Sequence, residues 1–213
     1  YNSQNVLQDM VSSLLAYAPA IDYELIFVDN ASTATRYLED EMARLARMDI
    51  PVSLIQNQTN TKFTHAANQG MRQARGEYIL LLNPDVVFFQ SWFSQLREEM
   101  DKHKWGIIAP KMIYPDKRIH FAGGAVSAGR YSHIGRDAVD TGEWDAPSEQ
   151  PWVTGACFMI HRRVYAALGG LDEKYPHYES DNKYCERARA QGFVVGYSGA
   201  ASTIIHLCGR SSA

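Results

Sequence analysis

The sequence predicts an α/β domain in which strands and helices alternate along the first half of the chain. Apolar runs too short for globular helices alternate with segments whose apolar residues recur at helical spacing. Two runs end on acidic residues, LIFVD at 25–29 and YILLLNPD at 78–85. Such alternation favours right-handed crossovers and a mostly parallel sheet, whose strands carry ligands at their carboxyl ends. We therefore expect Asp29 and Asp85 to share one cleft.

The elements follow from local signals, taken in order. A helix opens the chain between Val6 and Leu15, and further helices are expected from about Thr35, from Thr64 and from Ser91. Two later helices are expected at 162–168 and from Glu179 or Ser180 onward. The expected strands are 24–28, 52–55, 78–82, 105–109, 152–160, 193–197 and 202–206.

The 213 residues suit a single domain, 1–213, with halves at 1–110 and 111–213. Residues 111–151 show little periodicity and predict a functional excursion over one edge of the cleft. A domain of this class normally begins with a buried strand, whereas a helical pattern follows Tyr1 directly. We therefore expect that the first strand is missing from the printed sequence and that both ends are trimmed.

Composition excludes several classes of protein. A hydrophobic content of 46% with 21% charged residues is ordinary for a globular protein. A formal charge of -3 argues against a nucleic-acid partner, because phosphate binding needs clustered basic residues. No apolar run is long enough to cross a bilayer and no signal peptide opens the chain, so a cytoplasmic location is the expectation.

The cysteines and glycines also carry information. Cys157, Cys185 and Cys208 are odd in number and contain no CxxC pair, which indicates neither a disulfide framework nor a zinc knot. We expect them to be buried as small apolar side chains. No GxGxxG follows any expected strand, which counts against a dinucleotide-dependent dehydrogenase.

Several motifs, in order, resemble family 2 glycosyltransferases of the GT-A fold, and most of all their rhamnosyltransferase-like branch. The matching stretches are Tyr1-Asn2, VDNAS at 28–32, AANQGMRQARGEYILLLNPD at 66–85, GGLDE at 169–173, the acidic helix start at 179–181 and HLCGRS at 206–211. The resemblance implies a Rossmann-like, mostly parallel sheet flanked by helices. It also implies a nucleotide-binding half, 1–110, and an acceptor-binding half, 111–213.

The resemblance implies a metal-dependent, inverting transfer from a dTDP- or UDP-sugar to a glycan or lipid-linked acceptor, with possible peripheral membrane contact. Asp85 is then a ligand of Mg²⁺ or Mn²⁺ bridging the diphosphate, and His206 is a further ligand that favours Mn²⁺. The alternative for His206 is a core histidine. The residues that the resemblance assigns to the sugar nucleotide are Tyr1, Asp29, Asn30, Lys62, Asn83 and Asp85.

Asp181 is the candidate catalytic base, and Glu179 is the reserve. The first turn of a helix favours the ionised form of a carboxylate, which predicts a lowered pKa for Asp181. The alternative is a capping carboxylate without chemistry. By resemblance, Trp152, Gly155 and Asp172 lie on the acceptor side, and Asp172 is alternatively a loop cap.

Five further histidines are expected on the surface or in loops, namely His65, His120, His133, His161 and His177. Of these, only His133 is a candidate contact of the donor site. Lys62, Ser180 and Lys183 depart from the family pattern. These departures keep a non-catalytic sugar-nucleotide or carbohydrate-binding module open as an alternative. A sugar-1-phosphate nucleotidyltransferase is a further alternative, but the Gly-rich phosphate loop that it needs is absent from the sequence.

Overall fold

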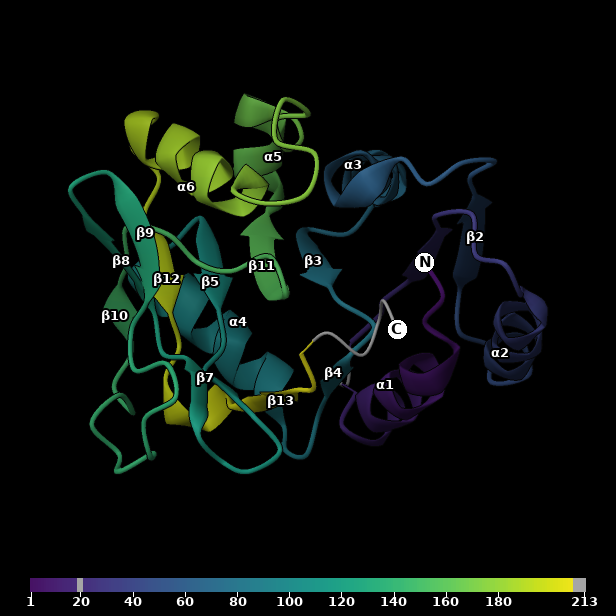
Figure 1. The fold of residues 1–213 in the computed structure, drawn as a ribbon, viewed down its shortest axis with the longest axis horizontal. Helices are drawn as coiled ribbons and strands as arrows, with labels where there is room; N and C mark the ends of the chain where they lie inside the picture. Colours follow the sequence, from purple (N-terminus) through teal and green to yellow (C-terminus); the bar gives the residue numbers. More distant parts are fainter. Residues whose placement is uncertain (19–20, 209–213) are drawn as a thin grey trace.

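The computed structural model describes residues 1–18 and 21–208 and has the α/β architecture that the sequence predicts (Figure 1). The first half of the chain contains α1 (Gln4–Ala16), β1 (Leu25–Asp29), α2 (Arg36–Ala46), β2 (Val52–Gln56) and α3 (Lys62–Gln73). Strands β1 and β2 pair in parallel, as expected for strands joined by a crossover helix. Residues 209–211 of the HLCGRS motif lie outside the described residues.

A five-stranded sheet forms the centre of the molecule. Its order is β10 (Ser148–Glu149), β12 (Val195–Tyr197), β5 (Ile107–Ala109), β11 (Cys157–His161) and β3 (Tyr78–Leu82). Strands β5 and β12 are parallel, but β11 runs antiparallel to both β5 and β3. The α/β class is confirmed, while the pairing is more mixed than predicted. The reason is that β11 returns from the excursion and enters between β3 and β5 from the opposite end.

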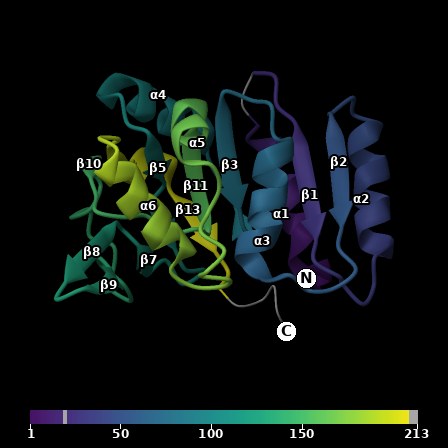
Figure 2. The same ribbon diagram turned by 90° about the horizontal axis from the view of Figure 1, so that it is seen from above.

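Strands β1 and β3 share no ladder among the described residues, and their ribbons stand apart in Figure 2. Among the described residues, β1 pairs only with β2, and β3 pairs only with β11. The apolar residues Leu25 to Val28 and Leu80 to Leu82 are only half-buried, whereas β5 is fully buried. The expectation of a further strand ahead of Tyr1 stays a prediction.

The excursion is more ordered than its lack of periodicity suggested, because short strands form within it. These are β6 (Met112–Ile113), β7 (Ile119–Phe121), β8 (Gly124–Ser127), β9 (Arg130–His133) and β10. Strands β8 and β9 form a hairpin. The buried ammonium of Lys111 holds the distal part of the excursion by pairing with Asp140 at 2.6 Å and Asp145 at 2.7 Å.

A four-stranded sheet joins the excursion to the end of the chain. Its order is β4 (Val86–Val87), β13 (Ile204–His206), β6 and β7. Met112 pairs with Phe121 and Ile113 with Ile119, so His120 is one extra residue on β7. Such a β-bulge redirects the side chain of the extra residue.

Helices α4 (Trp92–His103), α5 (Arg162–Leu168) and α6 (Ser180–Ala190) and the 3-10 turn η1 (Ala200–Ser202) complete the elements. The apolar face of α4 buries Trp92, Leu96 and Met100 in the core, and α6 buries Tyr184, Cys185 and Ala188. The strand expected at 152–160 forms only from Cys157, which leaves Trp152 to Ala156 as irregular backbone. Within the described ranges, no helix combines the length and apolar character needed to cross a membrane.

Candidate active site

A cavity of about 770 Å³ opens between the β8–β9 hairpin and the start of α6. Its wall includes aromatic side chains, two arginines and two carboxylates. Its lining residues include Tyr131, His133, Trp152, Glu179, Asp181, Arg130 and Arg136. Apolar walls with a few polar groups are typical of small-molecule sites. The cavity therefore combines flat aromatic surfaces with positive charges that suit anionic groups.

Asp181 lies on the wall of this cavity, at the start of α6. Its carboxylate accepts hydrogen bonds from the backbone N–H groups of Gly155 at 2.6 Å and Asn182 at 2.9 Å. Burial raises the pKa of Asp181, although these N–H groups act in the opposite direction. The prediction of a lowered pKa is therefore wrong, because desolvation outweighs the helix terminus. A raised pKa brings the carboxylate nearer to the basicity that a general base needs.

The other residues expected near Asp181 take different positions. Glu179 lines the cavity in the left-handed region, with φ 66°, and precedes the first residue of α6. Gly155 stands against Asp181, and a Cβ there would lie 3.3 Å from the Asp181 carboxylate. Asp172 accepts a hydrogen bond from the N–H of Lys174 at 3.0 Å, as a loop cap does. Asp172 is not part of the cavity wall.

Trp152 forms the aromatic wall of the cavity and is 3% exposed. Its indole N–H donates to the carbonyl of Ala125 at 3.0 Å, which fixes the ring against the hairpin. The rings of Tyr131 and His133 lie 5.9 and 5.4 Å from it, centroid to centroid. The aromatic wall is thus rigid before any ligand arrives.

Asp85 and His206 are brought together by the antiparallel pairing of β4 and β13. The N–H of Leu207 donates to the carbonyl of Asp85 at 2.8 Å, and His206 pairs with Val86. His206 Nε2 lies 3.3 Å from Asp85 Oδ1, and both side chains are buried. Burial alone would lower the pKa of His206, but Asp85 and then Cys208 raise it to about 9.

This pair fits the divalent metal that the fold family implies. A carboxylate oxygen and an imidazole nitrogen face each other at 3.3 Å in a buried setting, and both are donor types that Mn²⁺ accepts. One carboxylate is offered, because Asn83 and Pro84 precede Asp85. A metal held by these two residues would take its further oxygen ligands from phosphate groups and from water.

Asp29 and Asn30 lie together after β1, where their polar atoms contact neighbouring loops. Asp29 accepts hydrogen bonds from the hydroxyl and the N–H of Ser32. The Asn30 carbonyl oxygen accepts from the N–H and hydroxyl of Thr61, both at 2.9 Å, and from Asn57 at 3.2 Å. Its amide group donates to Asn60 at 2.9 Å. Asn30 thus organises the loop between β2 and α3.

Tyr1 and Lys62 flank this pair. Asn2, next to Tyr1, donates its N–H to the Ser32 hydroxyl at 2.8 Å, so the start of the described chain lies over the 29–32 loop. Tyr1 is 44% exposed. Lys62 has φ 68°, its side chain is exposed, and its carbonyl accepts from Asn30 at 3.2 Å. Neither side chain is held by neighbours in a way that hides it from a ligand.

Asp85 and His206 connect to the cavity through a row of histidine rings. The ring of His120 lies 4.7 Å from that of His206 and 5.2 Å from that of His133, which lines the cavity. A backbone bond from the N–H of Asn83 to the carbonyl of Ala156 at 2.8 Å makes a second link. Asp29, Asn30, Lys62 and Asp85 are not part of the cavity wall itself.

The expectation of a surface or loop position for His120 is wrong. His120 is 6% exposed, and burial followed by the charge of His206 lowers its pKa to about 3. His120 is buried because of the β-bulge in β7, which no sequence pattern indicated. The sequence reasoning also missed Arg130 and Arg136, although both stand in the excursion that it marked as functional.

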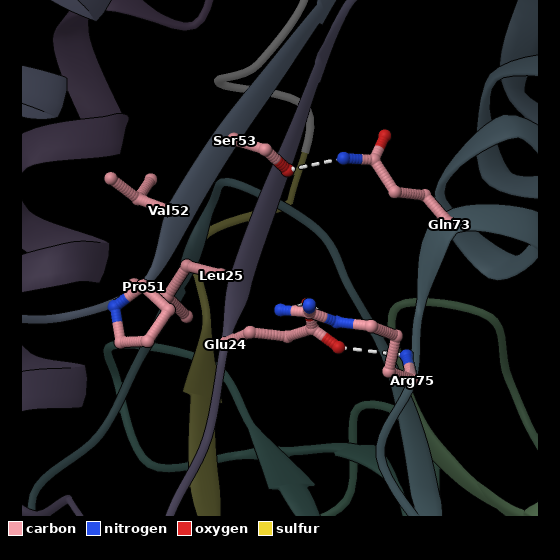
Figure 3. Close-up of a pocket in the computed structure, with 7 residues that line it drawn as sticks. All are labelled: Glu24, Leu25, Pro51, Val52, Ser53, Gln73 and Arg75. Carbon is pink, nitrogen blue, oxygen red and sulfur yellow. Dashed lines mark hydrogen bonds and ion pairs between the residues drawn. The ribbon is translucent and has the colours of Figure 1, made fainter.

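A second cavity, of about 310 Å³, lies at the amino-terminal ends of β1 and β2 (Figure 3). Its polar groups pair with one another, Arg75 with Glu24 at 3.1 Å and Gln73 with Ser53 at 2.8 Å. Ligand sites in α/β sheets occur at the carboxyl ends of the strands. This cavity is therefore not a candidate for the chemistry.

Known proteins resemble this chain over most of its length. The O-antigen biosynthesis protein RfbC of Myxococcus xanthus is 27% identical over 201 residues, covering 90% of this chain and 15% of that protein. The N-acetylglucosaminyl-diphospho-decaprenol L-rhamnosyltransferase of Mycobacterium tuberculosis is 24% identical over 144 residues, covering 61% of this chain and 47% of that enzyme. The chain therefore spans less than half the length of these curated relatives.

Solved structures also resemble this chain in fold. The crystal structure of GalNAc-T7 with UDP, GalNAc and Mn²⁺ superposes with a TM-score of 0.78 at 16% identity, covering 94% of this chain and 40% of that one. At this identity the likeness concerns the fold alone. The sequence profile described as glycosyl transferase family 2 matches residues 1–169. The chain therefore belongs to glycosyl transferase family 2 and has the GT-A fold.

Proposed function

We propose that this chain is the catalytic domain of an inverting glycosyltransferase that moves a sugar from a dTDP- or UDP-sugar to a glycan or lipid-linked acceptor. The observation that carries the proposal is the carboxylate of Asp181. It is held by two backbone N–H groups on the wall of a cavity that aromatic rings and arginines surround. Residues 1–110 would bind the nucleotide, and residues 111–213 would bind the acceptor.

Asp181 is the proposed base in this reaction. An acceptor hydroxyl in the cavity loses its proton to the Asp181 carboxylate while its oxygen attacks the anomeric carbon on the face opposite the diphosphate. Inversion follows because the new bond forms opposite the one that breaks. Glu179 stays the reserve candidate, since it lines the same cavity.

The donor would lie across the strand ends. Asp85 and His206 would hold Mn²⁺ or Mg²⁺, which neutralises charge on the departing diphosphate when bound. Asp29 and Asn30 would shape the loop for the base and ribose. Tyr1 and Lys62, which flank that pair, and Asn83, two residues before Asp85, would be further donor contacts. Trp152 offers its face to a sugar ring of the acceptor.

The arginines favour an acceptor that carries phosphate. Arg130 and Arg136 line the cavity, where a diphosphate linked to a lipid would meet them. The mycobacterial relative is named for an acceptor of that kind, and the Myxococcus relative for O-antigen biosynthesis. We therefore place the reaction in cell-envelope polysaccharide synthesis, at the cytoplasmic face of a membrane.

Thermal unfolding with nucleotide tests the donor site. UDP or dTDP with Mn²⁺ at about a hundredfold excess over Kd should raise Tm by about 5–10 °C. Asp85→Ala should abolish this shift, and Asp181→Asn should retain it while losing transfer. A shift that survives Asp85→Ala would contradict the assigned metal position. Transfer at the normal rate by Asp181→Asn would contradict the assigned base.

A further inference from the structure

Three donor atoms converge on the side of the His206 ring that faces away from Asp85. His206 Nδ1 lies 3.3 Å from His120 Nδ1 and 3.4 Å from Cys208 Sγ. All three donor atoms lie within 4.8 Å of one another. Both histidines are buried and Cys208 is half-buried. This cluster is separate from the Nε2 atom, which faces the Asp85 carboxylate.

Two of the three distances within the cluster match those between ligands of one metal ion, and the third is within 4.8 Å. With zinc bonds of about 2.0–2.1 Å to nitrogen and about 2.3 Å to sulfur, tetrahedral ligands lie roughly 3.3–3.6 Å apart. The two contacts of His206 Nδ1 fall at 3.3 and 3.4 Å. A hydrogen bond is a weaker explanation, because one ring nitrogen carries one proton or one lone pair. It can therefore satisfy only one of its two neighbours well.

The backbone directs these side chains inward by two unusual conformations. The β-bulge on β7 makes His120 the extra residue of its strand. Cys208 has φ 43°, a left-handed conformation that is uncommon outside glycine. Two independent local costs at the same cluster indicate that the arrangement has a use.

Asp85 supports the ring from its other side. Its carboxylate lies 3.3 Å from Nε2, where it can accept that N–H and fix the tautomer that leaves Nδ1 as a ligand. Metal-binding histidines commonly have such a carboxylate on the second nitrogen. Asp85 would therefore be a positioning residue for this cluster, in contrast to its role as a ligand on the Nε2 side.

We propose that His120, His206 and Cys208 form a second metal site, which takes a borderline-soft transition metal, Zn²⁺ above all. Two imidazoles and a thiolate suit Zn²⁺ and discriminate against Mg²⁺ and Mn²⁺, which prefer oxygen ligands. Water or a substrate oxygen completes a tetrahedron.

One consequence rests on the proposed function. A neutral His206 ring has one lone pair, so a metal held at Nδ1 leaves a proton on Nε2 and removes the ligand from the Asp85 position. Zn²⁺ at the second site should therefore weaken the Mn²⁺-dependent binding of nucleotide, and excess Mn²⁺ with UDP should weaken Zn²⁺ binding by the same factor.

Cobalt titration tests the site without any sugar nucleotide. Co²⁺ added to the reduced, chelator-treated protein should give a thiolate-to-cobalt charge-transfer band in the near ultraviolet, saturating at one equivalent and displaced by Zn²⁺. Cys208→Ser should abolish the band. His120→Gln should lower the affinity for Co²⁺ by at least roughly tenfold. Cys185→Ala is the matched control, because that buried thiol lies on α6 and should leave the band unchanged.

Either of two results would overturn the proposal. One is a cobalt band that persists in Cys208→Ser, and the other is cobalt bound by the wild type without a charge-transfer band. Asp85→Ala at saturating Co²⁺ should keep the band while losing the nucleotide shift, and loss of both would place the metal on the Nε2 side. A Tm measured for each metal-free variant identifies any that fail to fold, and Cys208→Ala then replaces Cys208→Ser. A wild-type protein that shows the cobalt band but no thermal shift with UDP and Mn²⁺ would count against the proposed function only.

Discussion

The polar residues after β1 and those at the start of α6 differ in what they contact. Asn30 hydrogen-bonds to Asn57, Asn60, Thr61 and Lys62, so its amide is satisfied by the protein itself. Asp181 contacts two backbone N–H groups and faces a cavity. Asn30 therefore shapes the loops around it, whereas the carboxylate of Asp181 lies where a substrate in the cavity could reach it.

Replacing Asp181 should have the largest effect on the rate of transfer. Asp181→Asn keeps the shape and the hydrogen bond from Gly155 but removes the basic oxygen, so kcat should fall by roughly 10²- to 10⁴-fold. Initial rates with saturating donor measure this. Glu179→Gln is the control, because it lines the same cavity. A larger loss in Glu179→Gln than in Asp181→Asn would exchange their roles.

Replacing Asn30 should lower the stability of the protein more than it lowers the rate of the chemical step. Asn30→Ala leaves several buried partners without their hydrogen bonds, which should cost roughly 2–3 kcal/mol and lower Tm by about 5–10 °C. Thermal unfolding measures this, with the exposed Asn5→Ala as a control that should not lose stability. If Asn30→Ala unfolds normally but no longer binds nucleotide, Asn30 contacts the ligand directly and the contrast with Asp181 disappears.

The raised pKa of Asp181 predicts a pH-dependent difference between the wild type and Asp181→Asn. As pH rises above the ordinary value of 3.8, the unfolded carboxyl ionises first and stabilises the unfolded state. The wild type should therefore lose stability relative to Asp181→Asn until pH passes the folded pKa, after which the difference is constant. Urea unfolding of both proteins from pH 3 to 8 measures it. A difference of opposite sign would mean that the folded pKa is lowered.

The smallest effect should come from Lys183, which ties the cavity wall together at the surface. Its ammonium lies 3.0 Å from both the Tyr131 hydroxyl and a Glu186 oxygen, linking α6 to the hairpin. Lys183→Met should leave Tm unchanged and raise the acceptor KM by roughly two- to fivefold. Lys102→Met on α4 is the control. An unchanged KM would show that the β8–β9 hairpin keeps its position without the hydrogen bond from Lys183 to Tyr131.

The fold class could be predicted from the sequence, because it depends on local signals. The assignment of Asp85 and His206 to a metal came from the family resemblance and stays a prediction. Apolar runs that end in Asp29 and Asp85 mark strand ends wherever the rest of the chain goes. The antiparallel entry of β11, the burial of His120 and the raised pKa of Asp181 depend instead on contacts between distant segments. The helix terminus at Asp181 was visible in the sequence, but the desolvation that outweighs it was not.

The extra residue on β7 has an evolutionary consequence. Alternate residues of a strand face opposite sides, and a bulge absorbs one residue without turning its neighbours over. The ring of His120 can therefore be gained or lost through the insertion or deletion of a single codon, with the facing of Ile119 and Phe121 preserved. We expect sister sequences to differ in zinc sensitivity according to whether this codon is present, even where their sugar chemistry is identical.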